Sequence, residues 1–177
     1  MDDRLNGTIA ALMQEQIARG AQIGVQVCVY QNGEQLAEVV AGEMGPDDPR
    51  PVRDDTLFSS FSTTKGVAAT ALHILADRGQ IDYDAPVATY WPAFAANGKG
   101  GITVAQAMSH QAGLHAMPVP SGVEDLTDWE RGLAWVANGT PAWEPGTATG
   151  YHAITYAWIV GGIVEGATGR KIADVVR

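Results

Sequence analysis

Cysteine is nearly absent from the 177-residue chain: Cys28 is the only one, so no internal disulfide bond and no zinc site built on thiolates can form. Val25, Val27 and Val29 surround Cys28, and this apolar setting predicts a buried packing residue. Basic side chains are also few, because eleven Lys and Arg against twenty Asp and Glu leave a net charge of -9. Such a chain lacks the basic surface of nucleic-acid binders and is repelled by anionic membranes, so we expect neither partner.

Long apolar runs are missing too. The longest stretch poor in charge, Tyr151–Gly162, is shorter than the about 20 apolar residues that span a bilayer and is interrupted by His and Gly. Residues 1–6 are acidic and polar, without the basic and then apolar order of a secretory signal. Taken as written, the sequence predicts a soluble, cytoplasmic protein.

The N-terminal part is expected to form a helix followed by a β-hairpin. Apolar residues recur at helical spacing over residues 5–17. Residues 24–30 are rich in β-branched side chains, Asn32-Gly33 is a two-residue turn signal, and residues 36–41 form a second apolar run. The segment 43–55 combines Pro and Gly with five carboxylates, which predicts a loop.

The rest of the chain is expected to be mainly helical. Residues 62–78 form a long, mostly apolar helix that should be central to the fold. Further elements are expected as helices at 103–108, 129–136 and 154–166, an irregular segment at 110–123 and a turn at 143–146. The last residues, 171–177, have a helical pattern without a stop signal, so the chain is expected to end inside a helix.

These elements predict one domain over residues 1–177, with its C-terminal part missing. We divide it into a sheet region of helix, hairpin and loop (1–57), a mainly helical region (58–168) and the start of a cut-off helix (169–177). A two-stranded hairpin is marginal alone, so further strands or a covering helix are required.

The candidate chemistry lies in Ser62-Thr63-Thr64-Lys65, because the common hydrolase, metalloprotease and nucleotide-binding signatures are absent. Residues three apart at a helix start share a face, so Lys65 can reach the Ser62 hydroxyl. A Lys against apolar surface loses part of its preference for the charged form and can accept the proton of a nucleophilic Ser. The backbone N–H of Ser62, at the positive end of the helix, is expected to supply half of an oxyanion hole.

The alternative interpretation is a helix cap with a solvated Lys. Chance alone gives at least one Ser-x-x-Lys roughly once in twelve sequences of this composition, so the tetrapeptide by itself is weak. Against this, Lys65 is one of only three lysines and lies in the most apolar predicted helix.

A set of short motifs, in order, resembles the serine β-lactamase-like superfamily, in particular class C β-lactamases and family VIII carboxylesterases. The matching segments are Phe58 to Lys65, Ala76 to Val87, Ile102 to Val104, Ser109 to Leu114, Pro145-Gly146 with Tyr151, and Val164 to Gly169. The resemblance implies an α+β fold of the β-lactamase/transpeptidase type, in which a helical region packs on an antiparallel sheet. It also implies that the later strands of that sheet are absent from this chain.

The resemblance also assigns the second catalytic motif to Tyr151, whose phenol faces the nucleophile and shares proton transfer with the Lys. A Tyr beside an ammonium should have a lowered pKa, which agrees with this role. Without the resemblance, an amphipathic core Tyr is the simpler interpretation.

Two departures from the family pattern bear on the substrate. Class C enzymes usually have Tyr-x-Asn, but here Tyr151-His152-Ala153 lacks the Asn that holds an amide, which favours simple esters. We place His152 and Ala153 at the substrate, although a structural role for His152 is an equal alternative. Nothing after Tyr151 matches the family's third motif, so the second oxyanion donor would come from a second chain or a missing C-terminal portion.

Other polar residues are given no catalytic role. Ser109 and His110 are neighbours that point apart on a helix, and the histidines lack metal-ligand spacing, so no metal site is expected. The acidic residues around Trp129, between 124 and 130, could form a lid, but a solvated face is the simpler interpretation.

The sequence therefore predicts a serine hydrolase of carboxylesterase type that cleaves small-molecule esters through an acyl-enzyme. Ser62 is the nucleophile, Lys65 and Tyr151 move its proton, and no cofactor is needed. The alternatives are a β-lactamase, D-aminopeptidase or acyltransferase of the same superfamily, or a non-catalytic fragment or scaffold.

Overall fold

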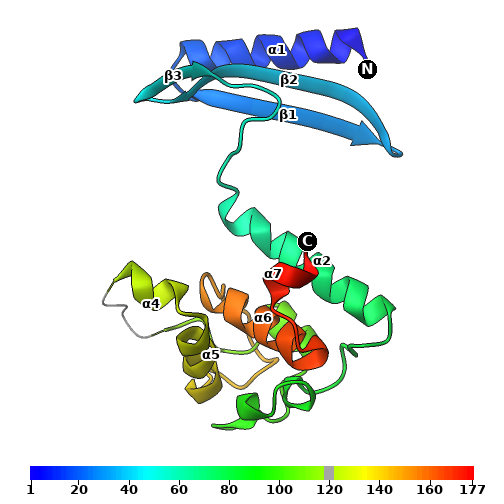
Figure 1. Cartoon of the computed structure of the whole chain (residues 1–177), viewed down its shortest axis with the longest axis vertical. Helices are drawn as coiled ribbons and strands as arrows, with labels where there is room; N and C mark the ends of the chain where they lie inside the picture. The colour runs from blue at the N-terminus through cyan, green and yellow to red at the C-terminus, as the bar shows by residue number, and fades with distance from the viewer. Residues whose placement is uncertain (118–121) are drawn as a thin grey trace. The chain divides into compact units, whose positions relative to one another are not determined.

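The computed structural model describes residues 1–117 and 122–177. The chain falls into two compact units, residues 1–59 and residues 60–177 (Figure 1). Their boundary lies two residues beyond the expected division between the sheet region and the helical region. That the whole chain forms one domain stays a prediction.

The first unit is a helix lying along a three-stranded antiparallel sheet (Figure 1). Helix α1 (Asp3–Ala18) begins at Asp2, whose carboxylate accepts hydrogen bonds from the first backbone N–H groups of the helix. Strands β1 (Gly24–Gln31) and β2 (Glu34–Gly45) form the predicted hairpin. Asn32 and Gly33 both have positive φ, at 51° and 82°, as the turn signal requires.

The predicted loop over residues 43–55 is wrong for most of its length, up to Pro51. Strand β2 continues to Gly45, and β3 (Asp48–Pro51) pairs with it, with Glu43 opposite Pro51. Proline is tolerated because β3 is an edge strand, where a missing backbone N–H costs no ladder bond. Composition alone indicated a loop, whereas pairing with β2 decides the local structure.

The prediction that Cys28 is buried is also wrong, because its side chain is exposed. In the β1–β2 ladder Cys28 lies opposite the exposed Glu38, while its neighbour Val29 lies opposite the fully buried Ala37. Successive side chains of a strand point to opposite faces, so Val29 lies on the buried face and Cys28 on the exposed one.

The second unit is helical and is organised around α6 (Thr155–Thr168), in which nine consecutive or near-consecutive residues are buried. Around it lie α2 (Thr64–Asp77), α3 (Val104–Met108), α4 (Val123–Thr127), α5 (Trp129–Asn138) and α7 (Ile172–Val175), with 3-10 turns η1 (Phe61–Thr63), η2 (Val87–Thr89) and η3 (Pro92–Ala95). The predicted helices at 103–108, 129–136 and 154–166 are thus confirmed to within two residues at each end. Of the predicted irregular segment 110–123, residues 118–121 lie outside the described residues.

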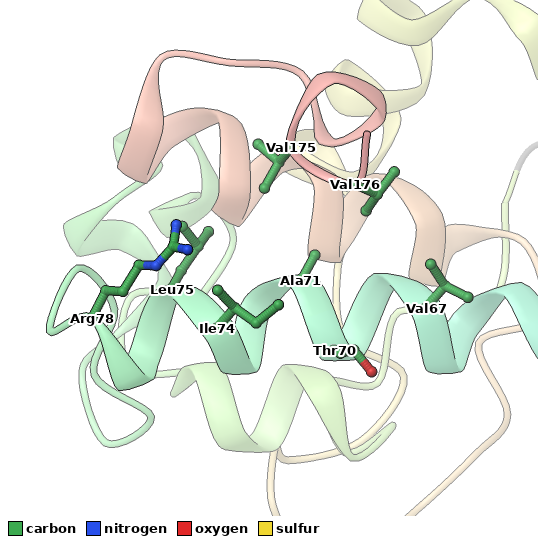
Figure 2. A pocket seen from close by; sticks show the side chains of 8 residues that line it. All are labelled: Val67, Thr70, Ala71, Ile74, Leu75, Arg78, Val175 and Val176. Atoms are coloured by element: carbon green, nitrogen blue, oxygen red, sulfur yellow. The ribbon is translucent and has the colours of Figure 1, made fainter. Parts of the chain in front are cut away.

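Within the unit of residues 60–177, helix α2 is buried on one face only. It buries Ala71, Leu72 and Leu75, but Val67 and Ile74 are 55% and 45% exposed. Figure 2 shows Val67, Ala71, Ile74 and Leu75 along a mainly apolar groove between α2 and the end of α7. The volume of this groove is about 310 Å³. Within the unit of residues 60–177, helix α2 therefore leaves one face uncovered, and α6 takes the central place.

Glycines allow α5 and α6 to pack closely against tryptophans. A Cβ at Gly132 would stand 2.0 Å from Nε1 of Trp158, and a Cβ at Gly161 would stand 2.2 Å from the ring of Trp129. Trp129 also donates a hydrogen bond of 2.7 Å to the Glu165 carboxylate. Each helix thus places a glycine against a tryptophan ring of the other helix.

Gly161→Ala is expected to lower the free energy of unfolding by about 1–3 kcal/mol, because the added methyl overlaps the Trp129 ring. Gly66→Ala is the matched control: Gly66 is also helical, but a Cβ there meets nothing within 4 Å. That control should be neutral or stabilise by up to about 1 kcal/mol through helix propensity. Urea unfolding followed by circular dichroism measures both, and equal effects of the two variants would contradict this packing.

In the two described ranges, no helix is long and apolar enough to cross a membrane.

Candidate active site

Ser62 and Lys65 lie where η1 runs into α2. The preceding residue, Phe61, has a φ of 44°, a left-handed backbone that is rare for a bulky side chain and often marks a functional turn. Lys65 lies one helical turn beyond Ser62, and its Nζ donates a hydrogen bond of 3.2 Å to Ser62 Oγ. The Ser-x-x-Lys spacing therefore brings these two side chains together as predicted.

Tyr151 reaches the same hydroxyl from a segment 89 residues away. Its phenol donates a hydrogen bond of 2.6 Å to Ser62 Oγ, and Lys65 Nζ lies 5.0 Å from the centre of its ring. Helices α2 and α6 are in contact, which brings the segment before α6 close to the start of α2. Ser62 Oγ is thus within hydrogen-bond distance of two groups that can exchange a proton.

The electrostatics of this cluster favour ionisation of Tyr151. Hydrogen bonding with Ser62 and then with Lys65 lowers the pKa of Tyr151 below 10.0. Desolvation opposes this change, and the charge of Lys65 adds a smaller lowering. A phenolate accepts a proton more readily than a phenol. The fraction of Tyr151 able to act as a base therefore rises with pH, and this rise begins at a lower pH than for an ordinary Tyr.

Ala153 contributes to the cluster through its backbone. Its carbonyl accepts a hydrogen bond of 2.7 Å from Lys65 Nζ, which fixes the direction of the ammonium toward Ser62. The side chain is only a methyl group and is exposed, so it offers a substrate no hydrogen bond.

The side chain of His152 lies in the interior of the helical unit. Its side chain is fully buried, and Nε2 accepts a hydrogen bond of 2.9 Å from the Leu114 N–H. Nδ1 therefore carries the proton and donates it to the Gly150 carbonyl at 2.6 Å. Both ring nitrogens are thus engaged by backbone groups, an arrangement that favours the structural alternative over contact with a substrate.

His110 is a site residue that the sequence reasoning missed. Its φ is 63°, and its ring centre lies 5.2 Å from that of Tyr151 and 4.8 Å from that of Tyr156. The signal available in the sequence was its place within the Ser109 to Leu114 motif. The neighbouring Ser109 ends α3, and its hydroxyl donates a hydrogen bond to the Ala105 carbonyl within that helix.

The remaining candidates have structural contacts. His73 hydrogen-bonds to the Tyr83 hydroxyl at 2.5 Å, and His115 stacks on Trp143 with ring centres 5.1 Å apart. In the parts of the chain that the structure describes, no group of three or more His, Cys, Asp or Glu side chains could hold a metal ion.

The acidic stretch around Trp129 is a solvated face with one exception. Glu124, Asp128 and Glu130 are exposed. Asp125 is buried and pairs with Arg131. Most of this stretch therefore agrees with the simpler interpretation.

Comparisons with known proteins place this arrangement in a family. The sequence profile of the Beta-lactamase family matches residues 9–177. A relative named Esterase/beta-lactamase LipL, from Mycobacterium tuberculosis, is 41% identical over 154 residues, which are 87% of this chain and 35% of LipL. A solved family VIII carboxylesterase has a TM-score of 0.92 at 37% identity, over 99% of this chain and 48% of its own. A class C β-lactamase from Rhodobacter sphaeroides has a TM-score of 0.72 at 28% identity, over 94% of this chain and 46% of its own.

The α+β fold is thus the β-lactamase/transpeptidase fold, as predicted. The chain belongs to the β-lactamase family, and the resemblance to class C β-lactamases and family VIII carboxylesterases is confirmed. It spans less than half the length of the relatives named above.

Proposed function

We propose that this chain carries the nucleophilic part of a serine hydrolase that cleaves carboxylic esters through an acyl-enzyme. The observation that supports this is the position of Ser62 Oγ, 2.6 Å from the Tyr151 hydroxyl and 3.2 Å from Lys65 Nζ. A serine hydroxyl is a weak nucleophile unless a base accepts its proton, and here two candidate bases share one hydroxyl.

In the proposed first half-reaction, ionised Tyr151 accepts the Ser62 proton while Oγ forms a bond to the ester carbonyl carbon. The Lys65 ammonium stabilises the phenolate beforehand, and its bond to the Ala153 carbonyl holds it in place. The tetrahedral intermediate then breaks its bond to the alcohol oxygen, which takes a proton from Tyr151 or Lys65 as it leaves. The products are a free alcohol and an ester of Ser62.

In the second half-reaction, water attacks the acyl carbon and gives its proton to the residue, Tyr151 or Lys65, that protonated the alcohol. The bond to Ser62 Oγ breaks, Oγ regains a proton, and the carboxylic acid leaves. Protons and charges balance without any cofactor.

Esters are favoured over amides by the two residues after Tyr151. The Ala153 methyl group and the buried His152 offer no side-chain donor or acceptor for a substrate amide. A site that cannot hydrogen-bond an amide gains little from one. β-Lactam hydrolysis is the second candidate, because the name of the relative LipL includes both activities.

The test is covalent labelling of Ser62. The chain is incubated with p-nitrophenyl butyrate or with an alkyl fluorophosphonate, and the modified peptide is identified by mass spectrometry. We expect the adduct on Ser62, none in Ser62→Ala, and unchanged labelling in the control Ser59→Ala, which alters an exposed serine. No label in the unmodified chain, or full label in Ser62→Ala, would overturn the proposal.

The preference for esters is tested separately. With p-nitrophenyl butyrate and nitrocefin at equal concentration, Ser62 should be acylated faster by the ester. Faster acylation by nitrocefin would favour the β-lactamase alternative.

A further inference from the structure

The backbone on both sides of Tyr151 is bound by a single residue, His110. The Gly150 N–H donates to the His110 carbonyl at 3.1 Å, and the His152 N–H donates to His110 Nδ1 at 3.2 Å. Tyr151 itself is 56% exposed, so little packing of its own restrains it. The two hydrogen bonds to His110 therefore restrict the segment that carries the phenol to Ser62.

The conformation of His110 is unusual and suits this contact. A φ of 63° in a residue with a Cβ is uncommon, and such positions are retained where the surroundings require them. The ring lies against three others, since its centre is 5.2 Å from Tyr151, 5.4 Å from His152 and 4.8 Å from Tyr156. The imidazole is thus held between the Tyr151 segment and the first turn of α6.

These bonds determine the protonation state of His110. Nδ1 accepts a hydrogen bond from a backbone N–H, so it carries no proton, and the ring is neutral with its proton on Nε2. A second proton could be added only at Nδ1, and this would break the bond to the His152 N–H.

We propose that neutral His110 is a positioning residue that keeps the Tyr151 hydroxyl at Ser62. Protonation of His110 in acid releases the Tyr151 segment. The proposal rests on the function proposed above for Ser62 and Tyr151. His110 touches neither Ser62 nor a reacting atom, so it acts through Tyr151.

Four titratable groups face His110. They are Lys65 from α2, Tyr151 and His152 from the segment before α6, and Tyr156 from α6 itself. Burial, followed by the charge of Lys65, lowers the pKa of His110 below 6.5. Burial, followed by smaller charge effects of His110 and His115, also lowers the pKa of His152 against the opposing Gly150 bond.

Acid should weaken the contact between His110 and the Tyr151 segment. A histidine whose pKa is lower in the folded state contributes stability that is complete above about pH 6.5 and is lost as the pH falls below it. Both histidines also lose a backbone hydrogen bond when protonated. The Tyr151 segment should therefore loosen in acid, before any loss of the unit as a whole.

The experiment compares His110→Gly with His110→Asn. Both residues accept a positive φ, so neither variant is penalised by the backbone, but only Asn offers an acceptor, Oδ1, near the place of Nδ1. His73→Asn is the matched control, because His73 contacts Tyr83 and not Tyr151. Thermal unfolding of each variant shows that the comparison is made between folded proteins.

The first readout is the pKa of Tyr151, measured by ultraviolet difference titration with Tyr151→Phe as the blank. It needs no turnover, so it remains decisive if the proposed function fails. We expect His110→Gly to return this pKa toward 10.0, and His110→Asn and the control to keep it lowered. A lowered pKa retained in His110→Gly, or equal changes in the Gly and Asn variants, would overturn the proposal.

The second readout is the rate of Ser62 labelling by the fluorophosphonate as a function of pH. Displacement of a catalytic group by about 1 Å costs about a hundredfold, so His110→Gly should react about a hundredfold more slowly at neutral pH. His110→Asn has no imidazole to protonate and should lose less rate than the unmodified chain between pH 7 and 5. Parallel acid profiles of these two proteins would overturn the role of His110 protonation. An unlabelled Ser62 would overturn the proposed hydrolase without affecting the titration result.

Discussion

Lys65→Ala is expected to lower the rate of Ser62 labelling by about 10²- to 10⁴-fold, the usual contribution of a group that moves or stabilises a proton in the transition state. The ammonium now contacts both Ser62 Oγ and the Ala153 carbonyl, and it helps to lower the pKa of Tyr151. Its removal should therefore also raise that pKa toward 10.0. Labelling kinetics and ultraviolet titration of the same protein measure the two effects.

A second substitution separates charge from proton transfer at this position. Arg stays protonated throughout the working pH range, so Lys65→Arg keeps a cation near Tyr151 but cannot accept a proton. If Lys65→Arg keeps a low Tyr151 pKa but labels Ser62 slowly, Lys65 is the base that accepts the Ser62 proton. If Lys65→Arg still labels Ser62 rapidly, Tyr151 is that base. Lys171→Ala is the control, because Lys171 is exposed and lies just before α7 rather than at Ser62. Labelling of Lys65→Ala at the rate of this control would contradict the proposed role.

Lys99→Met is expected to destabilise the helical unit by about 3 kcal/mol or more. Lys99 is fully buried, and its Nζ donates to the carbonyls of Ala96, Ala137 and Gly139. Two of these carbonyls belong to the C-terminal end of α5, where a cation is favourable. Methionine fills the space of the stem but leaves the carbonyls without a donor, and each buried unsatisfied group costs about 1–3 kcal/mol.

Burial lowers the pKa of Lys99, while the three carbonyl oxygens act in the opposite direction because they bind the ammonium. Urea unfolding at neutral pH measures the cost of its loss. Lys171→Met, at an exposed position, should change stability by less than about 0.5 kcal/mol. A loss below about 1 kcal/mol in Lys99→Met would show that water replaces the ammonium at little cost.

The sequence did not distinguish Lys99 from a surface lysine. Lys99 follows Asn97-Gly98 and precedes two further glycines, a composition typical of an exposed turn. Its burial depends on α5 ending nearby with unpaired carbonyls, about forty residues further along the chain. No local pattern contains that information, because the partners come from another element.

The same limit explains the errors in the sheet unit. The alternation of Val25, Val27 and Val29 identified a half-buried strand, but not which face the intervening Cys28 would occupy once a single helix covered the sheet. Strand β3 was missed because its two prolines and the carboxylates in and around it indicate a loop, and only its pairing with β2 makes it a strand.

Residues close in the chain were predicted well, because a few bonds decide their geometry. The turn at Asn32-Gly33 depends only on the backbone of its own two residues and on the strands that flank it. The approach of Lys65 to Ser62 is of this kind too, since a helix start places residues i and i+3 on one face.

By itself, then, the sequence determined the order and type of most elements and the pairing of a serine with a lysine at a helix start, because these depend on local spacing. The family resemblance selected Tyr151, but only the packing of α2 against α6 brought its hydroxyl to Ser62 across 89 residues. Tertiary structure alone decided that His152 is buried and that His110 binds both sides of the Tyr151 segment. These contacts join residues about forty apart through backbone groups, whose positions are set only when the helices have packed.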